Sequence, residues 1–328
     1  MKLILNTRGD GHVAMDIAAE LEEAILSDEG ASVSAIQPKE SASSKSYGVW
    51  LRFERYFPEF IKSVTACLRA KLATGGQHYF NVLMEPNWMK CFPHVLYPGR
   101  KSVYLFDAWP VHHEMISQFV QTHHLSFVFV SSSQAAARLK DMSESSIFSW
   151  VPEGVDPNKY RHSQYAAKDI DVLELGRKYD IYHDHIVKAL EDDGRVHLYE
   201  KTKGKLIFPT GEDLTDGLAR TKISICVPSN ITHPDRAGDV ETMTVRYLQS
   251  MVSKCLIVGH APEEMVELFG YNPVVEIDME KPAQQIRDIL ENFTDYIPLI
   301  EKNYTETLAN HTWNDRWQQI RAIMQSAD

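Results

Sequence analysis

Residues 227–259 (VPSNITHPDRAGDVETMTVRYLQSMVSKCLIVG) hold the richest set of side chains able to bind a phosphorylated ligand. Arg236 and Arg246 each offer a fork of N–H donors that suits phosphate oxygens. Asp239 is a good N-cap residue, and a helix starting there would direct free N–H groups and the positive end of its dipole at an anion. The segment therefore predicts a phosphate site, although a capped surface helix would have the same pattern.

Two further polar residues of this segment could contact the rest of such a ligand. Glu241 and Gln249 are eight residues apart, which on a helix is about 12 Å of rise. One of them could therefore bind a sugar while the other meets a more distant part of the ligand. Thr242, next to Glu241, joins the same predicted binding set.

The first half of the chain has a polar loop directly after its first apolar run. Residues 2–6 (KLILN) read as a strand, and a helical pattern begins at Val13. The loop between them can cup a ligand because its two glycines permit tight turns, although a plain strand-to-helix turn would look the same. Its candidate residues are Gly9, Asp10, Gly11 and His12. Neither a complete GxGxxG fingerprint nor a Walker motif occurs, which argues against a dinucleotide-dependent dehydrogenase and a P-loop NTPase.

Two other loops of the first half carry groups suited to acid–base chemistry. Glu85 follows the apolar run at 79–84, and Asp107 follows the run at 102–106 with His112 and His113 close behind. A carboxylate can orient an imidazole and tune its pKa, so these residues could orient or deprotonate an acceptor. Histidines are also common as structural or exposed residues. No third ligand has convincing metal spacing, so no metal site is expected.

Alternating strands and helices must position these loops. The expected strands are residues 2–6, 31–36, 79–84, 102–106 and 125–130, then 171–175, 195–199, 222–227, 254–258 and 273–277. The expected helices include 13–26, 60–72, 282–294, 296–310 and 313–324. Such alternation predicts parallel sheets covered on both faces, and ligands of such sheets bind beyond the carboxyl ends of the strands. The fold class is therefore α/β with two doubly wound domains, and Pro and Gly residues at 151–169 place the boundary near 160.

Composition restricts the partners. The 328 residues include 34 Lys+Arg and 45 Asp+Glu, a formal net charge of −11. Nonspecific attraction to nucleic acid is therefore disfavoured. No apolar stretch approaches the ~18 residues of a transmembrane helix, so no membrane span is expected, while peripheral contact with a membrane stays open. Four cysteines without a CxxC pair indicate neither a disulfide framework nor a zinc knuckle, which favours a cytoplasmic protein.

The segment around Glu241 resembles the donor-site helix of GT-B glycosyltransferases, in particular family four and its CgeB-like relatives. The family pattern Glu-x7-Glu, a small residue, Met and a strand is met here by Glu241, Gln249-Ser250-Met251 and KCLIVG, with Gln in place of the second Glu. Arg246 matches an Arg of the CgeB-like pattern. VPEGVDPNKYR resembles the Asn-Gly-Val-Asp-x-x-x-Phe signature between the domains, with Glu153 in place of Asn and Tyr160 as the aromatic residue.

The resemblance implies a fold, an activity and roles for several residues. The fold would be GT-B, with two Rossmann-like domains facing a central cleft: an acceptor-side domain at 1–160 and a donor-binding domain at 161–328, the last helix (about 313–326) returning to the first domain. DVLELGRKYD resembles the family's strand and Gly-Arg turn, which makes Arg177 a diphosphate ligand. Glu241 would hold the donor sugar and Gln249 the ribose.

The implied reaction moves a sugar from a nucleoside diphosphate sugar, UDP- or GDP-linked, to an acceptor hydroxyl. The family resemblance favours retention of the anomeric configuration. No cofactor or metal is expected, because arginines and a helix end can stabilise the departing diphosphate. Two alternatives remain open at this point: a nucleotide-sugar epimerase or hydrolase of similar architecture, and a non-catalytic sugar-nucleotide binding module.

Overall fold

The computed structural model describes residues 2–6, 16–30, 32–36, 49, 52, 56, 77–91, 94–96, 99–143, 147–176, 178–202 and 204–326. Two compact units make up the chain. Unit 1 consists of Met1–Pro152 together with Trp317–Asp328, and unit 2 consists of Glu153–Arg316. The chain therefore leaves unit 1 at Pro152, eight residues before the boundary at 160 expected from the Pro and Gly residues.

Unit 1 is built on a parallel sheet in the order β2-β1-β3-β4-β5-β6. Its strands are β1 (Lys2–Asn6), β2 (Ser32–Ile36), β3 (Gln77–Leu83), β4 (Arg100–Leu105), β5 (Phe127–Val130) and β6 (Ile147–Trp150). The helices α1 (Asp16–Leu26), α4 (His113–His123) and α5 (Ser133–Met142) connect them. Strands β3, β4 and β5 are buried on both faces, which explains why they read as continuous apolar runs.

The last helix, α14 (Trp313–Ser326), contributes its final turns to unit 1. The indole nitrogen of Trp317 donates to a carboxylate oxygen of Asp28 at 2.7 Å, and Arg321 pairs with the same carboxylate at 2.7 Å. The ring of Trp317 also meets the ring of Phe80 edge-on, with centroids 5.8 Å apart. These contacts attach the carboxyl end of the chain to the turn after α1 and to β3.

Unit 2 is built on a second parallel sheet in the order β11-β10-β9-β7-β8. Its strands are β7 (Ile170–Glu174), β8 (His197–Tyr199), β9 (Thr221–Cys226), β10 (Leu256–Gly259) and β11 (Val275–Glu276). The connecting helices are α6 (Asp180–Asp192), α7 (Gly211–Arg220), α8 (Ser229–Thr232), α9 (Pro234–Ala237), α10 (Val245–Val252), α11 (Glu263–Phe269), α12 (Pro282–Glu291) and α13 (Ile297–Asn310).

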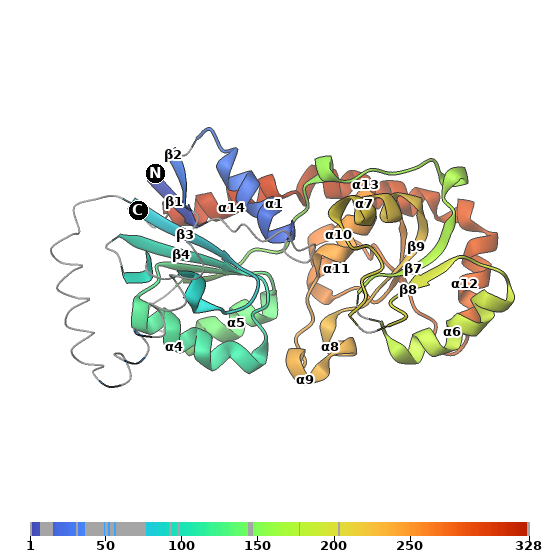
Figure 1. The fold of residues 1–328 in the computed structure, drawn as a ribbon, viewed down its shortest axis with the longest axis horizontal. Coiled ribbons are helices and arrows are strands. Elements are labelled where there is room, and N and C mark those ends of the chain that lie inside the picture. Colours follow the sequence, from blue (N-terminus) through green and yellow to red (C-terminus); the bar gives the residue numbers. More distant parts are fainter. Residues whose placement is uncertain are drawn as a thin grey trace. The chain divides into compact units, whose positions relative to one another are not determined.

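Two apolar cores flank the sheet of unit 2. One joins β9 and β10 to α10 and α11 through buried residues such as Tyr247 and Met265. The other joins β7 and β9 to α6 and α12 through residues such as Ile186 and Ile286, and α6 and α12 run side by side in Figure 1. Both faces are therefore covered, as expected for a parallel sheet.

The expected strands occur, with ends shifted by one or two residues, and β6 is an additional strand. The expected helix at 60–72 lies outside the described residues, as does the start of the helix expected at 13–26. Among the described residues, no helix combines the length and the apolar character needed to cross a bilayer.

Candidate functional site

The helix expected to begin at Asp239 begins six residues later. Helix α10 starts at Val245, with Thr244 as its N-cap residue, and Asp239 lies exposed in a turn after α9. The turn is set by Gly238, whose φ of 57° is accessible to glycine and strained for most other residues. The N-cap role of Asp239 was therefore a wrong prediction, and so was the placement of Glu241 and Gln249 on one helix: Glu241 lies in the loop before α10.

Two buried carboxylates hold this loop. Glu264, on α11, accepts hydrogen bonds from the hydroxyl of Thr242 at 3.0 Å and from the N–H of Met243 at 2.7 Å. Glu153 accepts a hydrogen bond from the N–H of Val245, the first residue of α10. These contacts keep residues 242–243 out of the helix.

The carboxylate of Glu153 also changes the expected electrostatics. An anion from the chain itself already occupies the first N–H of α10, where the sequence predicted a free N–H for a phosphate. Glu153 and Glu264 are buried, 6% and 4% exposed. Neither role was predicted from the sequence, where Glu153 appears only as a replacement within a motif and nothing near Glu264 points to this loop.

The structure places Arg246 at the carboxyl end of β7. Its Nη1 donates to the backbone carbonyl of Leu175 at 2.8 Å. Its Nη2 is buried and has no hydrogen-bond partner, a state that costs about 1 to 3 kcal/mol for a polar group and more for a charged one. The next residue, Gly176, has a φ of +75°, and a Cβ atom there would lie 3.8 Å from Nη1 of Arg246. Arg177, the expected diphosphate ligand, lies outside the described residues.

Glu241 belongs to a series of polar contacts that also includes Asn230, His260 and Glu276. Its Oε1 lies 3.3 Å from the amide nitrogen of Asn230 and 3.4 Å from Nε2 of His260. The other ring nitrogen of His260 lies 3.2 Å from a carboxylate oxygen of Glu276. The side chain of Glu241 is 26% exposed, so it can still reach a ligand.

The remaining expected donor residues are engaged within unit 2. The amide nitrogen of Gln249 donates to the hydroxyl of Tyr160 at 2.8 Å, and Gln249 is only 7% exposed. Arg236 is half-buried on the short helix α9. Thr242 is buried against Glu264. Gln249 therefore has one donor already committed, which leaves its amide oxygen as the group that could accept from a ribose hydroxyl.

The candidate residues of unit 1 differ in exposure. His113 is buried at the start of α4, and its Nε2 donates to the carbonyl of Ala108 at 3.0 Å. Burial lowers the pKa of His113, and the hydrogen bond to Ala108 offsets this only in part. A neutral, tethered ring suits a structural role better than proton transfer. His112 and Asp107 are half-buried.

The other acceptor-side candidates include one exposed residue and one loop that cannot be assessed. Glu85 is exposed after β3. The expected loop residues Gly9, Asp10, Gly11 and His12 lie outside the described residues.

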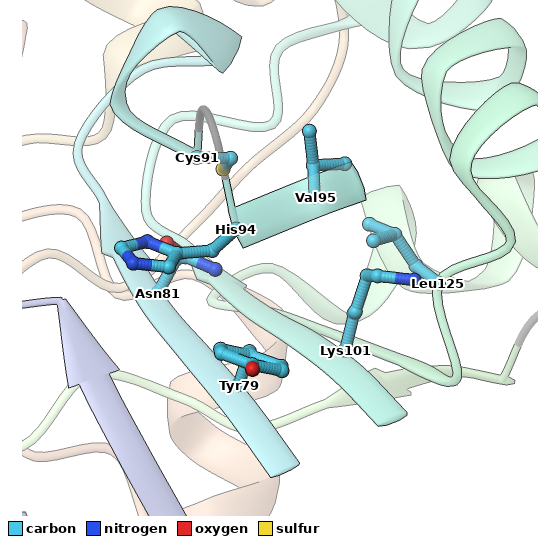
Figure 2. A pocket seen from close by; sticks show the side chains of 7 residues that line it. All are labelled: Tyr79, Asn81, Cys91, His94, Val95, Lys101 and Leu125. Carbon is cyan, nitrogen blue, oxygen red and sulfur yellow. The ribbon is translucent and has the colours of Figure 1, made fainter. Parts of the chain in front are cut away.

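A small pocket in unit 1 lies apart from the carboxyl ends of the strands. Figure 2 shows side chains of β3 and β4 next to the short helix at His94–Leu96. The pocket is lined by Tyr79, Asn81, Cys91, His94, Val95, Lys101 and Leu125. It has no room for a water molecule, so it is a packing gap and not a ligand site.

Comparison with known proteins identifies the fold. No protein-family model matches the sequence, and no curated protein matches it. Among solved structures, Anabaena Alr3699/HepE in complex with UDP and glucose is similar at a TM-score of 0.58 and 10% identity, over 99% of this chain and 100% of that chain. A second structure of the same protein holds UDP-glucose.

Two synthases show the same likeness over the whole chain. The sucrose-phosphate synthase of Thermosynechococcus elongatus has a TM-score of 0.59 at 12% identity, over 100% of this chain and 99% of that chain. The α,α-trehalose 6-phosphate synthase of Burkholderia multivorans has a TM-score of 0.55 at 11% identity, over 100% and 99%. These neighbours are GT-B glycosyltransferases, and the chain has their fold of two Rossmann-like α/β units.

Proposed function

We propose that this protein is a glycosyltransferase that moves a sugar from a UDP-linked donor to an acceptor hydroxyl. The observation that carries the proposal is the likeness, over 99% or more of both chains, to a structure that holds UDP and glucose. Arg246 supports it from within the site, since its buried Nη2 has no partner at the carboxyl end of β7, where ligands of open α/β sheets bind.

In this proposal unit 2 binds the donor. Arg246, with Arg177 and Arg236, contacts the diphosphate. Gly176 has no side chain to block phosphate oxygens next to Arg246. Glu241 binds the donor sugar, since it lies in a loop and is partly exposed. Gln249 accepts from a ribose hydroxyl, and Thr242 and Asp239 shape the loop around the sugar.

Unit 1 takes the acceptor in this proposal. Asp107, His112 and Glu85 follow strand ends and remain accessible, and the loop at Gly9, Asp10, Gly11 and His12 belongs to the same set. His113 orients the start of α4 through its bond to Ala108.

The proposed reaction breaks the bond between the anomeric carbon and the β-phosphate oxygen. The acceptor oxygen bonds to that carbon, UDP leaves with the electron pair, and the acceptor proton passes to a base. Guanidinium groups stabilise the negative charge that develops on the departing diphosphate, so transfer needs no divalent metal. Retention of configuration is part of the proposal on the strength of the family-four resemblance.

The buried thiols of Cys91, Cys226 and Cys255 are free, which suits a reducing cytoplasm. The proposal therefore places the protein there.

A donor-turnover assay tests the proposed function. The protein would be incubated with UDP-glucose and related donors, with and without a panel of sugar and lipid-linked acceptors, and UDP release would be measured. Transfer predicts UDP release that depends on the acceptor, at a rate that added Mg²⁺ or Mn²⁺ leaves unchanged. Conversion of the donor without acceptor would favour an epimerase or hydrolase. Tight UDP binding without any turnover would favour the binding module.

A further inference from the structure

Unit 2 contains a buried polar cluster of three side chains. The cluster is separate from helix α10 and from the loop before it. Glu174 is the last residue of β7, His197 is the first residue of β8, and His183 lies in the first turns of α6. Their side chains are 1%, 2% and 7% exposed, respectively. One carboxylate oxygen of Glu174, Oε1, lies 2.6 Å from Nδ1 of His183 and 2.8 Å from Nε2 of His197.

The hydrogen bonds within the cluster leave two buried atoms unsatisfied. The second carboxylate oxygen of Glu174, Oε2, has no hydrogen-bond partner, and neither has Nδ1 of His197. The cluster therefore holds a carboxyl group in the protein interior with one oxygen unmatched. Buried polar groups are normally hydrogen-bonded, and buried charged groups are paired or coordinate a metal.

We propose that Glu174, His183 and His197 bind a zinc ion. The ligand atoms are one carboxylate oxygen and two imidazole nitrogens, and all lie within 4.8 Å of one another. Two histidines with one carboxylate are an established ligand set for zinc, whereas Mg²⁺ and Ca²⁺ prefer oxygen ligands. A water molecule would take the fourth position of a tetrahedral zinc, and the unmatched Oε2 can accept a hydrogen bond from it.

Zinc replaces protons at this cluster. Zn–O and Zn–N distances of about 2.0 to 2.2 Å separate the ligand atoms of a tetrahedral site by roughly 3.3 Å. The present O···N distances of 2.6 and 2.8 Å are those of hydrogen bonds. Binding therefore moves the ligand atoms apart by about half an ångström. The proton of each hydrogen bond leaves the nitrogen that binds zinc: a charged imidazole releases it to solvent, and a neutral imidazole carries its proton on the other ring nitrogen instead.

The role of this ion is structural. It joins side chains of β7, β8 and α6 that now meet through hydrogen bonds to one carboxylate oxygen. Leu175, the residue after Glu174, supplies the carbonyl that anchors Arg246. Zinc at the cluster would therefore stiffen the strand end that carries this anchor, without contacting the donor in the proposed reaction.

A zinc titration of the whole protein tests the site. Protein stripped of metal would be titrated with ZnCl₂ against a chromophoric chelator, in the absence of any nucleotide. We expect one equivalent of zinc bound with a Kd below ~1 µM. At free zinc a hundred times that Kd, the Tm should rise by roughly 5 to 10 °C and return on adding EDTA. Cobalt(II) should give the visible absorption of a tetrahedral N/O site.

A matched pair of variants on α6 assigns the ion to the cluster. His183→Gln should abolish the high-affinity equivalent and the cobalt spectrum, whereas His185→Gln, at an exposed histidine two residues along the same helix, should keep both. The proposal is overturned if the wild-type protein binds no zinc in this range, or if the two variants lose zinc equally. The wild-type titration decides the matter even if His183→Gln fails to fold. Because no nucleotide is present, the result does not depend on the proposed glycosyl transfer.

Discussion

Nη1 of Arg246 donates a hydrogen bond to the backbone carbonyl of Leu175 at 2.8 Å, and this bond joins helix α10 to the end of β7. The two residues are 71 positions apart in the sequence, and Leu175 begins the loop after β7. The bond orients the guanidinium next to Gly176 and leaves Nη2 buried without a partner. A phosphate oxygen is the group that would satisfy this donor.

Glu241→Gln should separate catalysis from nucleotide binding. Gln keeps the size of the side chain but removes the charge proposed to act on the donor sugar. We expect turnover to fall by about 100-fold or more while the Kd for UDP stays within about threefold. Turnover would be measured by UDP release and affinity by calorimetry.

Glu276→Gln is the control for this variant, because Glu276 contacts the same histidine, His260, from its other ring nitrogen. It should keep most of the activity. Equal losses in the two variants would assign the effect to the position of His260 and not to Glu241.

Glu264→Gln should destabilise the protein. Thr242 and Met243 both donate to one carboxylate oxygen of Glu264, Oε1, and a neutral amide oxygen accepts such hydrogen bonds more weakly than a carboxylate oxygen does. We expect the free energy of unfolding to fall by about 1 to 3 kcal/mol, measured by urea unfolding. The adjacent exposed residue offers a control, since Glu263→Gln should change stability by less than about 0.5 kcal/mol. Similar losses for the two variants would show that Glu264 does not hold the loop.

His311 should make stability depend on pH. It is 2% exposed, and its Nδ1 accepts from Nη2 of Arg316 at 2.7 Å. Burial, together with the charge of Arg316, lowers the pKa of His311 from 6.5 to about 4. Its contribution to stability is therefore fully present above pH 6.5 and is lost as the pH falls towards 4, because the unfolded chain binds the proton more tightly.

Urea unfolding at pH 7.5 and pH 4.5 measures this contribution. Between these two values the wild-type protein should lose about 2 kcal/mol more than the His311→Gln variant. Identical losses in the two proteins would mean that His311 titrates normally in the folded state.

The strand pattern was predictable from the sequence, and the details of the site were not. Strands such as β4 and β5 are buried on both faces, so their apolar runs are unambiguous in the sequence. The start of α10 was misplaced because the groups that fix it are distant: Glu153 lies 92 residues from Val245, and Glu264 lies 21 residues from Met243. A local capping rule at Asp239 cannot include such contacts.

The same reason explains the missed cluster at Glu174, His183 and His197. The histidines are 9 and 23 residues from Glu174 along the chain, without a regular ligand spacing. The parallel pairing of β7 with β8 brings His197 to Glu174, and the packing of α6 on the sheet brings His183. Arg246, in contrast, was predicted as a phosphate ligand from its neighbours in the sequence. It lies beside Leu175 and Gly176, and its role as a phosphate ligand stays a prediction.

Calorimetric titration of UDP into the wild-type protein and into Arg246→Ala is the most direct test of the account. The wild-type protein should bind one UDP, and Arg246→Ala should bind it at least about tenfold more weakly, a loss of about 1.4 kcal/mol. Arg287→Ala, at an exposed arginine paired with Asp193 in the same unit, should bind UDP like the wild type. The absence of nucleoside diphosphate binding to the wild-type protein, or equal affinities in the Arg246→Ala and wild-type proteins, would contradict the account.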